Sequence, residues 1–221
     1  MITFKTFRDA IQQGVYRIIN PSVKLMIRVG VTPNMITTIG FLGNAFAASL
    51  FVYSALCVPA DDFSVVGIAG AVILFSSIFD MIDGYLARTG NMCSVFGAFY
   101  DSVLDRYCEL FTLSGMAFYF MRLEMPIGTV ATMLSLIGSI MVSYVRARAE
   151  GLDVECKVGL MQRPERVVLT SLGAMLCGIL APCVREQFNP VWIMLVPQII
   201  IAILANWTAF VRINHVRGKM Q

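Results

Sequence analysis

The sequence predicts an all-α integral membrane protein with six transmembrane helices and a preceding amphipathic helix. Hydrophobic residues make up 57% of the 221-residue chain and charged residues only 14%, against about 25% charged residues in soluble domains. Six long apolar segments follow one another, and the breaks between them carry turn residues such as Pro59 and Gly90. Lipid is therefore expected to solvate much of the surface. The small net charge of +3 argues against nucleic acid as a partner.

The first 22 residues are expected to form a juxtamembrane helix that lies on the membrane surface. Apolar residues recur there at helical spacing, with Lys5, Arg8 and Arg17 among them, which is typical of an interfacial amphipathic helix. An ordinary surface helix is the alternative. Residues 23–221 are expected to form one transmembrane domain, because a span needs about 20 apolar residues. The spans are predicted at residues 35–57, 64–86, 95–121, 125–147, 167–184 and 191–211.

The basic residues predict which side of the membrane each loop faces. Fourteen of the 17 Lys and Arg residues fall on one side of the predicted bundle, whereas only Arg122 and Arg185 fall on the other. Arg106 lies inside a span. Because cytoplasmic segments are enriched in Lys and Arg, both termini are expected to face the cytoplasm from the cell (plasma or inner) membrane.

Ionisable residues gather in the second and third predicted spans. Burying an ionisable side chain in a membrane costs free energy, so such residues usually have a functional role. The turn at residues 89–94 is short, so the two helices are expected to be antiparallel neighbours whose polar stripes face each other. One stripe contains Asp80, Asp83, Gly84, Ala87 and Arg88, and the other contains Gly97, Asp101 and Asp105.

Four carboxylates that converge in a low-dielectric site cannot all ionise without cations. Arg88 and Arg106 neutralise only two of them, and all-oxygen ligands suit Mg²⁺, Mn²⁺ or Ca²⁺ rather than zinc. A divalent metal site is therefore favoured, with an ion path or a structural salt-bridge network as alternatives. Gly84 and Gly97 either admit a bulky ligand, whose phosphate Arg88 can hold, or serve helix packing. The predicted metal ligands are Asp80, Asp83, Asp101 and Asp105.

The two stripes together resemble the complete signature of the CDP-alcohol phosphotransferase family. They read Asp80-x2-Asp83-Gly84-x2-Ala87-Arg88-x8-Gly97-x3-Asp101-x3-Asp105. Eight fixed residues at fixed spacing make a chance match improbable. Residues 32–37, Thr-Pro-Asn-Met-Ile-Thr, also resemble the segment before the family's first span. The resemblance covers nearly the whole chain and implies six spans, a cytoplasmic active site and a homodimer.

The resemblance also implies a role for each matched residue. Asp80, Asp83 and Asp101 are implied to bind a pair of divalent metals, Mg²⁺ or Mn²⁺, with Asp105 contributing to the second. Asp105 is also implied to be the general base for the acceptor hydroxyl, which attacks the phosphorus bearing the lipid while CMP leaves. The residues implied to contact CDP-diacylglycerol are Asn34, Thr37, Gly84, Ala87, Arg88, Ser94 and Gly97.

A second set of basic residues bears on the acceptor alcohol. Arg146, Arg148, Arg163 and Arg166 are too dense to face lipid, so they predict a cationic pocket beside the aspartates, suited to a phosphorylated acceptor. Anchoring to anionic lipid headgroups is the alternative. The segment is similar to the phosphatidylinositol phosphate synthase branch of the family, including its archaeal relatives.

That branch implies transfer of the phosphatidyl group to inositol phosphate, giving phosphatidylinositol phosphate and CMP. The alternatives are a phosphatidylglycerophosphate synthase that uses glycerol 3-phosphate and, outside the family, a small ion transporter. Glu109, one turn beyond Asp105, is either a supporting group or a helix-pairing residue. The residues implied to bind the acceptor's phosphate are Ser143, Arg146, Arg166 and Arg212, with Arg148 and Arg163 in support.

Overall fold

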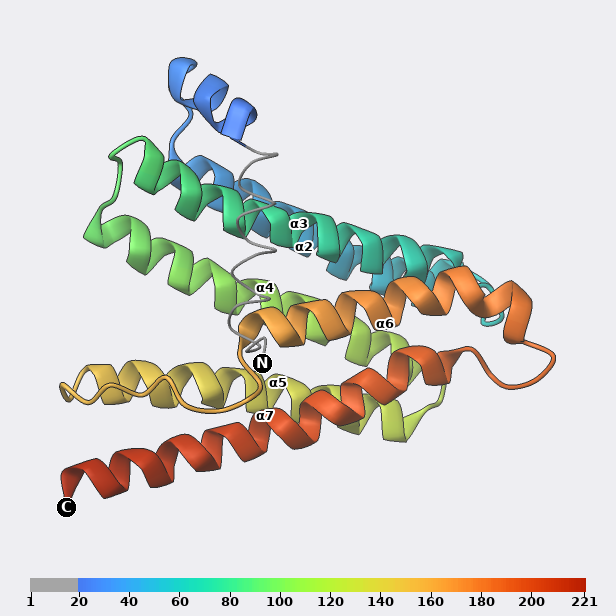
Figure 1. Ribbon diagram of the computed structural model, residues 1–221. Coiled ribbons are helices and arrows are strands. Elements are labelled where there is room, and N and C mark those ends of the chain that lie inside the picture. The colour runs from blue at the N-terminus through green and yellow to red at the C-terminus, as the bar shows by residue number, and fades with distance from the viewer. Residues whose placement is uncertain (1–19) are drawn as a thin grey trace, which may run out of the picture.

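The computed structural model describes residues 20–221, and this part of the chain is helical apart from its turns and loops (Figure 1). Each of its six long helices contains one predicted span. Several helices continue beyond the apolar run at the end rich in basic residues, because polar side chains there extend the helix out of the lipid. The helices are α2 (Pro33–Cys57), α3 (Ser64–Thr89), α4 (Val95–Arg122), α5 (Pro126–Glu150), α6 (Arg163–Val184) and α7 (Val191–Met220).

Five of these helices are long and apolar enough to cross a membrane, and α4 is not among them. It has the length, 28 residues, but Asp101, Asp105 and Glu109 reduce its apolar content. It nevertheless runs from one end of the bundle to the other (Figure 1), packed against α2 and α5, and so spans the same thickness as the other helices. The chain is a multi-pass all-α membrane protein, as predicted.

The predicted amphipathic helix at residues 1–22 lies, up to residue 19, outside the described residues. Residues 20–28 are helical, so the expected boundary at residues 22–23 falls within a helix. Val23 is fully buried, in a cluster with Ile36 of α2 and Leu86 of α3. This segment therefore packs against the start of α2 and the end of α3.

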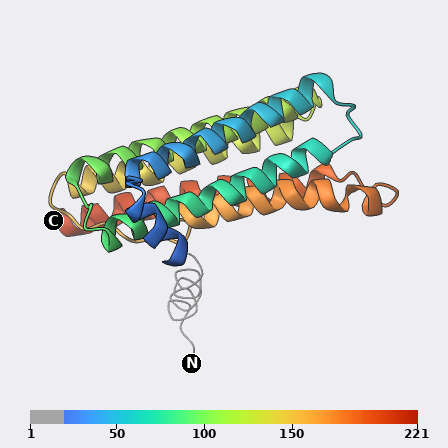
Figure 2. The same cartoon turned by 90° about the horizontal axis from the view of Figure 1, so that it is seen from above.

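The six helices form a ring whose spatial order differs from the order along the chain. The closely packed pairs are α2 with α3, α3 with α6, α6 with α7, α7 with α5, α5 with α4 and α4 with α2. Viewed from above, α2, α4 and α5 form one layer, and α3, α6 and α7 form the other (Figure 2). The turn between α3 and α4 makes them antiparallel, as predicted. They are not among the closely packed pairs, however, and each packs on α2 instead.

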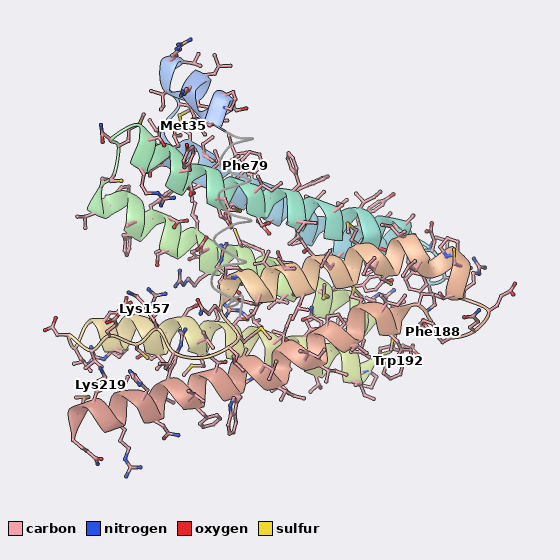
Figure 3. All side chains as sticks on the ribbon, viewed as in Figure 1. Met35, Phe79, Lys157, Phe188, Trp192 and Lys219 are labelled. Atoms are coloured by element: carbon pink, nitrogen blue, oxygen red, sulfur yellow. The ribbon has the colours of Figure 1, made fainter. Side chains whose placement is uncertain are left out.

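The two ends of the bundle differ in packing and charge. At one end, α3 and α6 touch through glycines: a Cβ on Gly178 would lie 2.5 Å from the Cα of Gly67. Phe188 and Trp192 lie toward that end, whereas Lys157 and Lys219 lie at the opposite end (Figure 3). The 90–94 turn, the 151–162 segment and the C-terminus all lie at the basic end (Figure 1). Asp80, Asp83, Asp101 and Asp105 belong to the basic half of the bundle.

Candidate active site

A first cavity, of about 210 Å³, opens where α2 and α4 begin and α3 ends; we call it the donor cavity. Asp83 and Asp101 line it. So do all seven residues predicted to contact the CDP-lipid: Asn34, Thr37, Gly84, Ala87, Arg88, Ser94 and Gly97.

Two helix N-termini point toward the donor cavity. Thr32 caps α2, its hydroxyl accepting a hydrogen bond from the Met35 amide. Ser94 caps α4, its hydroxyl accepting from the Gly97 amide at 2.9 Å. Helix N-termini carry partial positive charge and favour bound anions such as phosphates. The local structure therefore suits the diphosphate of a nucleotide-activated lipid.

Gly84 and Gly97 face this cavity rather than a neighbouring helix. A Cβ at Gly84 would meet only the Arg88 guanidinium, 3.4 Å away at its nearest atom, and a Cβ at Gly97 would meet side-chain oxygens of Ser94 and Asn34. No backbone of another helix approaches either position within 4 Å in the described residues. The structure thus favours ligand access over helix packing for both glycines.

Three of the four aspartates are tied to other helices. The Thr37 hydroxyl of α2 donates to Asp83 Oδ2 at 2.6 Å. Arg163, at the start of α6, donates from Nη1 to Asp80 Oδ2 at 2.7 Å and pairs through Nη2 with Asp105 Oδ1 at 2.8 Å. One guanidinium thus bridges a carboxylate of α3 and a carboxylate of α4, although these two helices do not pack closely.

The aspartates do not surround a common point. Within residues 20–221, no three Asp, Glu, Cys or His side chains form a ready set of metal ligands. The Arg163 guanidinium contacts both Asp80 and Asp105. The donor chemistry still fits a hard divalent cation, since four carboxylates share the site with one bridging arginine. The metal role of the aspartates therefore stays a prediction.

A second cavity, of about 360 Å³, lies among α4, α5, α6 and α7; we call it the acceptor cavity. Asp101 and Asp105 line it, and Asp101 also lines the donor cavity, so the two cavities meet at the carboxylates. Ser102 and Arg106 line it too, although the sequence assigned neither an acceptor role. Five of the six residues predicted for the acceptor's phosphate are present: Ser143, Arg146, Arg163, Arg166 and Arg212.

The sixth, Arg148, is exposed and does not line the acceptor cavity. Two residues along an α-helix correspond to a rotation of about 200°, so Arg148 lies on the opposite face of α5 from Arg146. Arg146 remains at the cavity and pairs with Glu150 at 2.8 Å. The predicted contact of Arg148 with the acceptor is therefore not supported by its position.

Arg212 is buried and holds the segment 151–162, which we call the strap. Its Nε donates to the Val158 carbonyl at 2.9 Å, and its Nη1 donates to the Val142 carbonyl of α5. Gly159 has φ +107°, and a Cβ there would lie 2.2 Å from Thr208 Cγ2, so the strap packs on α7 only with glycine at this position. Arg212 thus shapes the acceptor cavity as well as lining it.

Comparison with known proteins indicates the same class of substrates as the two cavities do. Residues 30–211 match the sequence model of the family described as CDP-alcohol phosphatidyltransferase. The archaetidylinositol phosphate synthase of Methanothermobacter thermautotrophicus is 30% identical over 195 residues, covering 88% of this chain and 87% of that protein. The phosphatidylinositol phosphate synthase of Mycobacterium tuberculosis is 33% identical over 162 residues, covering 72% of this chain and 69% of that protein.

Crystal structures of the Mycobacterium tuberculosis phosphatidylinositol phosphate synthase share this fold. The structure with CDP-DAG bound matches with a TM-score of 0.75 at 25% identity, over 90% of this chain and 94% of that one. The complex with manganese and citrate matches with a TM-score of 0.73 at 26% identity, over 89% and 87%. The likeness therefore extends over nearly the whole bundle.

Proposed function

Because the chain belongs to the CDP-alcohol phosphatidyltransferase family, we propose that it transfers the phosphatidyl group of CDP-diacylglycerol to a hydroxyl of inositol phosphate. The products are phosphatidylinositol phosphate and CMP. One observation carries the proposal: a cavity at two helix N-termini and a cavity lined by arginines meet at Asp101. The first suits a diphosphate and the second suits a phosphorylated alcohol.

The aspartates divide between the two cavities in a way that supports separate roles. Asp83 lines the donor cavity, Asp105 lines the acceptor cavity, and Asp101 lines both. The position of Asp105 in the acceptor cavity supports our proposal that it accepts the proton of the acceptor hydroxyl. The hydroxyl oxygen then forms a bond to the phosphorus that bears the lipid, and the bond from that phosphorus to the CMP oxygen breaks.

We propose that these carboxylates hold Mg²⁺ or Mn²⁺, in a two-metal site, as the all-oxygen donor set favours. A bound divalent ion neutralises charge on the diphosphate and on the departing CMP. A complex with manganese is known for the related phosphatidylinositol phosphate synthase. The proposed ligands are Asp80, Asp83, Asp101 and Asp105.

The acceptor's phosphate is proposed to bind the basic residues of the acceptor cavity. Arg166 and Arg212 enter from α6 and α7, and Arg146 enters from α5 with Ser143 one turn before it. Arginine suits this task because its planar guanidinium donates to two phosphate oxygens at once. Inositol phosphate and glycerol 3-phosphate both carry the required phosphate, so the choice between them rests on the likeness to phosphatidylinositol phosphate synthases.

The basic end of the bundle is proposed to face the cytoplasm, in the cell membrane. The excess of Lys and Arg at that end supports this orientation, and it places both cavities where a soluble phosphorylated alcohol is accessible. A homodimer is proposed from the family alone.

The decisive test measures CMP release from CDP-diacylglycerol by the purified protein in the presence of Mn²⁺. Inositol phosphate, glycerol 3-phosphate and serine are each supplied in turn as the acceptor. We expect release with inositol phosphate that EDTA abolishes. Release with glycerol 3-phosphate and none with inositol phosphate would replace our acceptor with that of a phosphatidylglycerophosphate synthase. If no acceptor gives metal-dependent CMP release, the proposed transferase activity is contradicted and ion transport becomes the favoured function.

A further inference from the structure

Glu109 and Arg166 form a buried ion pair beside the proposed acceptor site. Glu109 lies one turn beyond Asp105 in α4 and is 6% exposed, and Arg166 lies one turn beyond Arg163 in α6 and is 3% exposed. Arg166 Nε donates to Glu109 Oε1 at 2.8 Å, and its Nη2 donates to Oε2 at 3.0 Å. Two parallel bonds of this kind fix the plane of a guanidinium, which a single bond does not.

A third bond fixes the remaining rotation of Arg166. Its Nη1 donates to the Met161 carbonyl of the strap at 3.1 Å, and the Met161 amide donates to Thr208 Oγ1 of α7 at 3.3 Å. These contacts use three of the five N–H groups of Arg166. One N–H on each terminal nitrogen is then available to the acceptor cavity that Arg166 lines.

Glu109 contacts Arg166 from outside the acceptor cavity. Arg166 lines both the acceptor cavity and a smaller cavity of about 30 Å³ that lies deeper in the bundle. Of these two cavities, Glu109 lines only the smaller one. The carboxylate therefore contacts the guanidinium on the side of the smaller cavity, and it does not line the cavity proposed to bind the acceptor.

The alternative partners of Arg166 show why a dedicated carboxylate is needed. Asp101 and Asp105 line the same cavity as Arg166, and a buried guanidinium that lost its partner would be drawn to the nearest carboxylate, because an unpaired buried charge is costly. Arg163 already pairs with Asp105. A second arginine on that carboxylate would oppose both metal binding and proton acceptance.

We infer that Glu109 is a positioning residue that sets the affinity for the acceptor's phosphate by orienting Arg166 and keeping it away from the catalytic carboxylates. The inference rests on the proposed function for the nature of the acceptor. It adds a residue outside the Asp80–Asp105 signature and gives Glu109 the supporting role that the sequence left open.

The test compares Glu109→Gln with the wild type in detergent, by CMP release with Mn²⁺. We expect the KM for inositol phosphate to rise at least tenfold, with the KM for CDP-diacylglycerol within twofold. Thr112→Val is the matched control, because Thr112 lies one turn further along α4, is buried, lines the same smaller cavity and has no hydrogen-bond partner for its hydroxyl in the described residues. This control is expected to keep both KM values within twofold.

A double-mutant comparison shows whether Glu109 acts through Arg166. In an Arg166→Gln background, Glu109→Gln is expected to change the acceptor KM less than twofold, because the group that it orients is gone. Independent, multiplicative effects would overturn the inference. Equal rises in both KM values, or a fall in kcat alone, would overturn it too. If Glu109→Gln is not recovered folded, Glu109→Asp replaces it. Aspartate keeps the negative charge, but its side chain is too short to accept both hydrogen bonds from Arg166.

The outcome is separable from that of the proposed function. Wild-type protein that releases CMP with glycerol 3-phosphate alone would refute our acceptor, and the KM comparison would then be run with glycerol 3-phosphate. A selective rise in that KM supports the role of Glu109, and its absence refutes the role, whichever phosphorylated alcohol is used.

Discussion

Thr37 donates its hydroxyl hydrogen to Asp83 Oδ2 at 2.6 Å, and both side chains are buried. This bond joins α2 to α3 across 46 residues of sequence and fixes one oxygen of a proposed metal ligand. A hydrogen bond to a charged group contributes about 1.5–3 kcal/mol.

Removing that bond is expected to weaken metal binding. Thr37→Val should raise the Mn²⁺ concentration for half-maximal CMP release by about tenfold, which corresponds to ~1.4 kcal/mol. Thr132→Val is the control, because Thr132 is equally buried but donates only within its own helix, to the Gly128 carbonyl at 2.8 Å. An unchanged Mn²⁺ requirement in Thr37→Val would mean that Asp83 keeps its orientation without this bond.

Arg163 is expected to stabilise the protein most when metal is absent. Arg163→Gln leaves Asp80 and Asp105 without their bridging cation, and the three side chains are only 15–20% exposed, so losing the pair should destabilise the protein more than losing an exposed pair does. The melting temperature should therefore fall in EDTA and recover with Mn²⁺, giving a larger Mn²⁺-induced shift than in the wild type.

The matched control is Arg185→Gln. Arg185 lies 3.7 Å from Asp61 in an exposed pair at the other end of the bundle, and such pairs contribute only about 0–1 kcal/mol. Its melting temperature should follow the wild type in both conditions. Equal Mn²⁺-induced shifts in all three proteins would contradict the bridging role of Arg163.

Asp105→Asn is expected to abolish turnover while CDP-diacylglycerol binding remains measurable. The amide cannot accept the acceptor's proton as the carboxylate does, whereas the donor cavity is lined by Asp83 and Asp101 instead. Binding is measured by titration calorimetry and turnover by CMP release, with Asp62→Asn at the opposite end as the control. Near-normal turnover in Asp105→Asn would remove this residue as the base.

Two glycine substitutions should separate ligand access from packing. Gly84→Ala places a methyl group in the donor cavity near Arg88 alone, so it should raise the KM for CDP-diacylglycerol without lowering the melting temperature. Gly178→Ala forces a methyl group against the Gly67 backbone, and such overpacking costs about 1–3 kcal/mol. It should lower the melting temperature instead. A loss of stability in Gly84→Ala would show that this glycine serves packing after all.

Arg146 and Arg148 should differ although they are two residues apart. Arg146→Gln is expected to raise the KM for the phosphorylated acceptor severalfold, because Arg146 lines the acceptor cavity. Arg148→Gln should leave it within twofold, because Arg148 is exposed on the other face of α5. Steady-state CMP release with varied acceptor measures both. Equal effects would point to a general contribution of positive charge rather than to contact.

Local periodicity is enough to group part of the donor side. Asp83, Gly84, Ala87 and Arg88 share a stripe of one helix, and helix geometry alone places them on one cavity wall. The six helices and their turns followed from apolar segments and breaks for the same reason. The amphipathic helix predicted at residues 1–22 lies, up to residue 19, outside the described residues.

The acceptor side depends on contacts that no local pattern encodes. Arg166 meets Glu109 across 57 residues, and Arg163 reaches both Asp80 and Asp105 because α6 lies beside α3 in the ring. The sequence predicted only that α3 and α4 are antiparallel neighbours with facing polar stripes, since a short turn joins them, and it did not predict that α6 lies beside α3. Arg148 was grouped with Arg146 by proximity along the chain, although helical rotation places the two side chains on opposite faces.

The two cavities use different stretches of the polypeptide. Residues 33–101 supply the whole lining of the donor cavity, and residues 101–212 supply that of the acceptor cavity, with Asp101 common to both. Under the proposed function, substitutions in the second stretch are therefore expected to alter acceptor binding while the lining of the donor cavity stays unchanged. Chimeras joined after Asp101 would exchange the lining of the acceptor cavity as one unit.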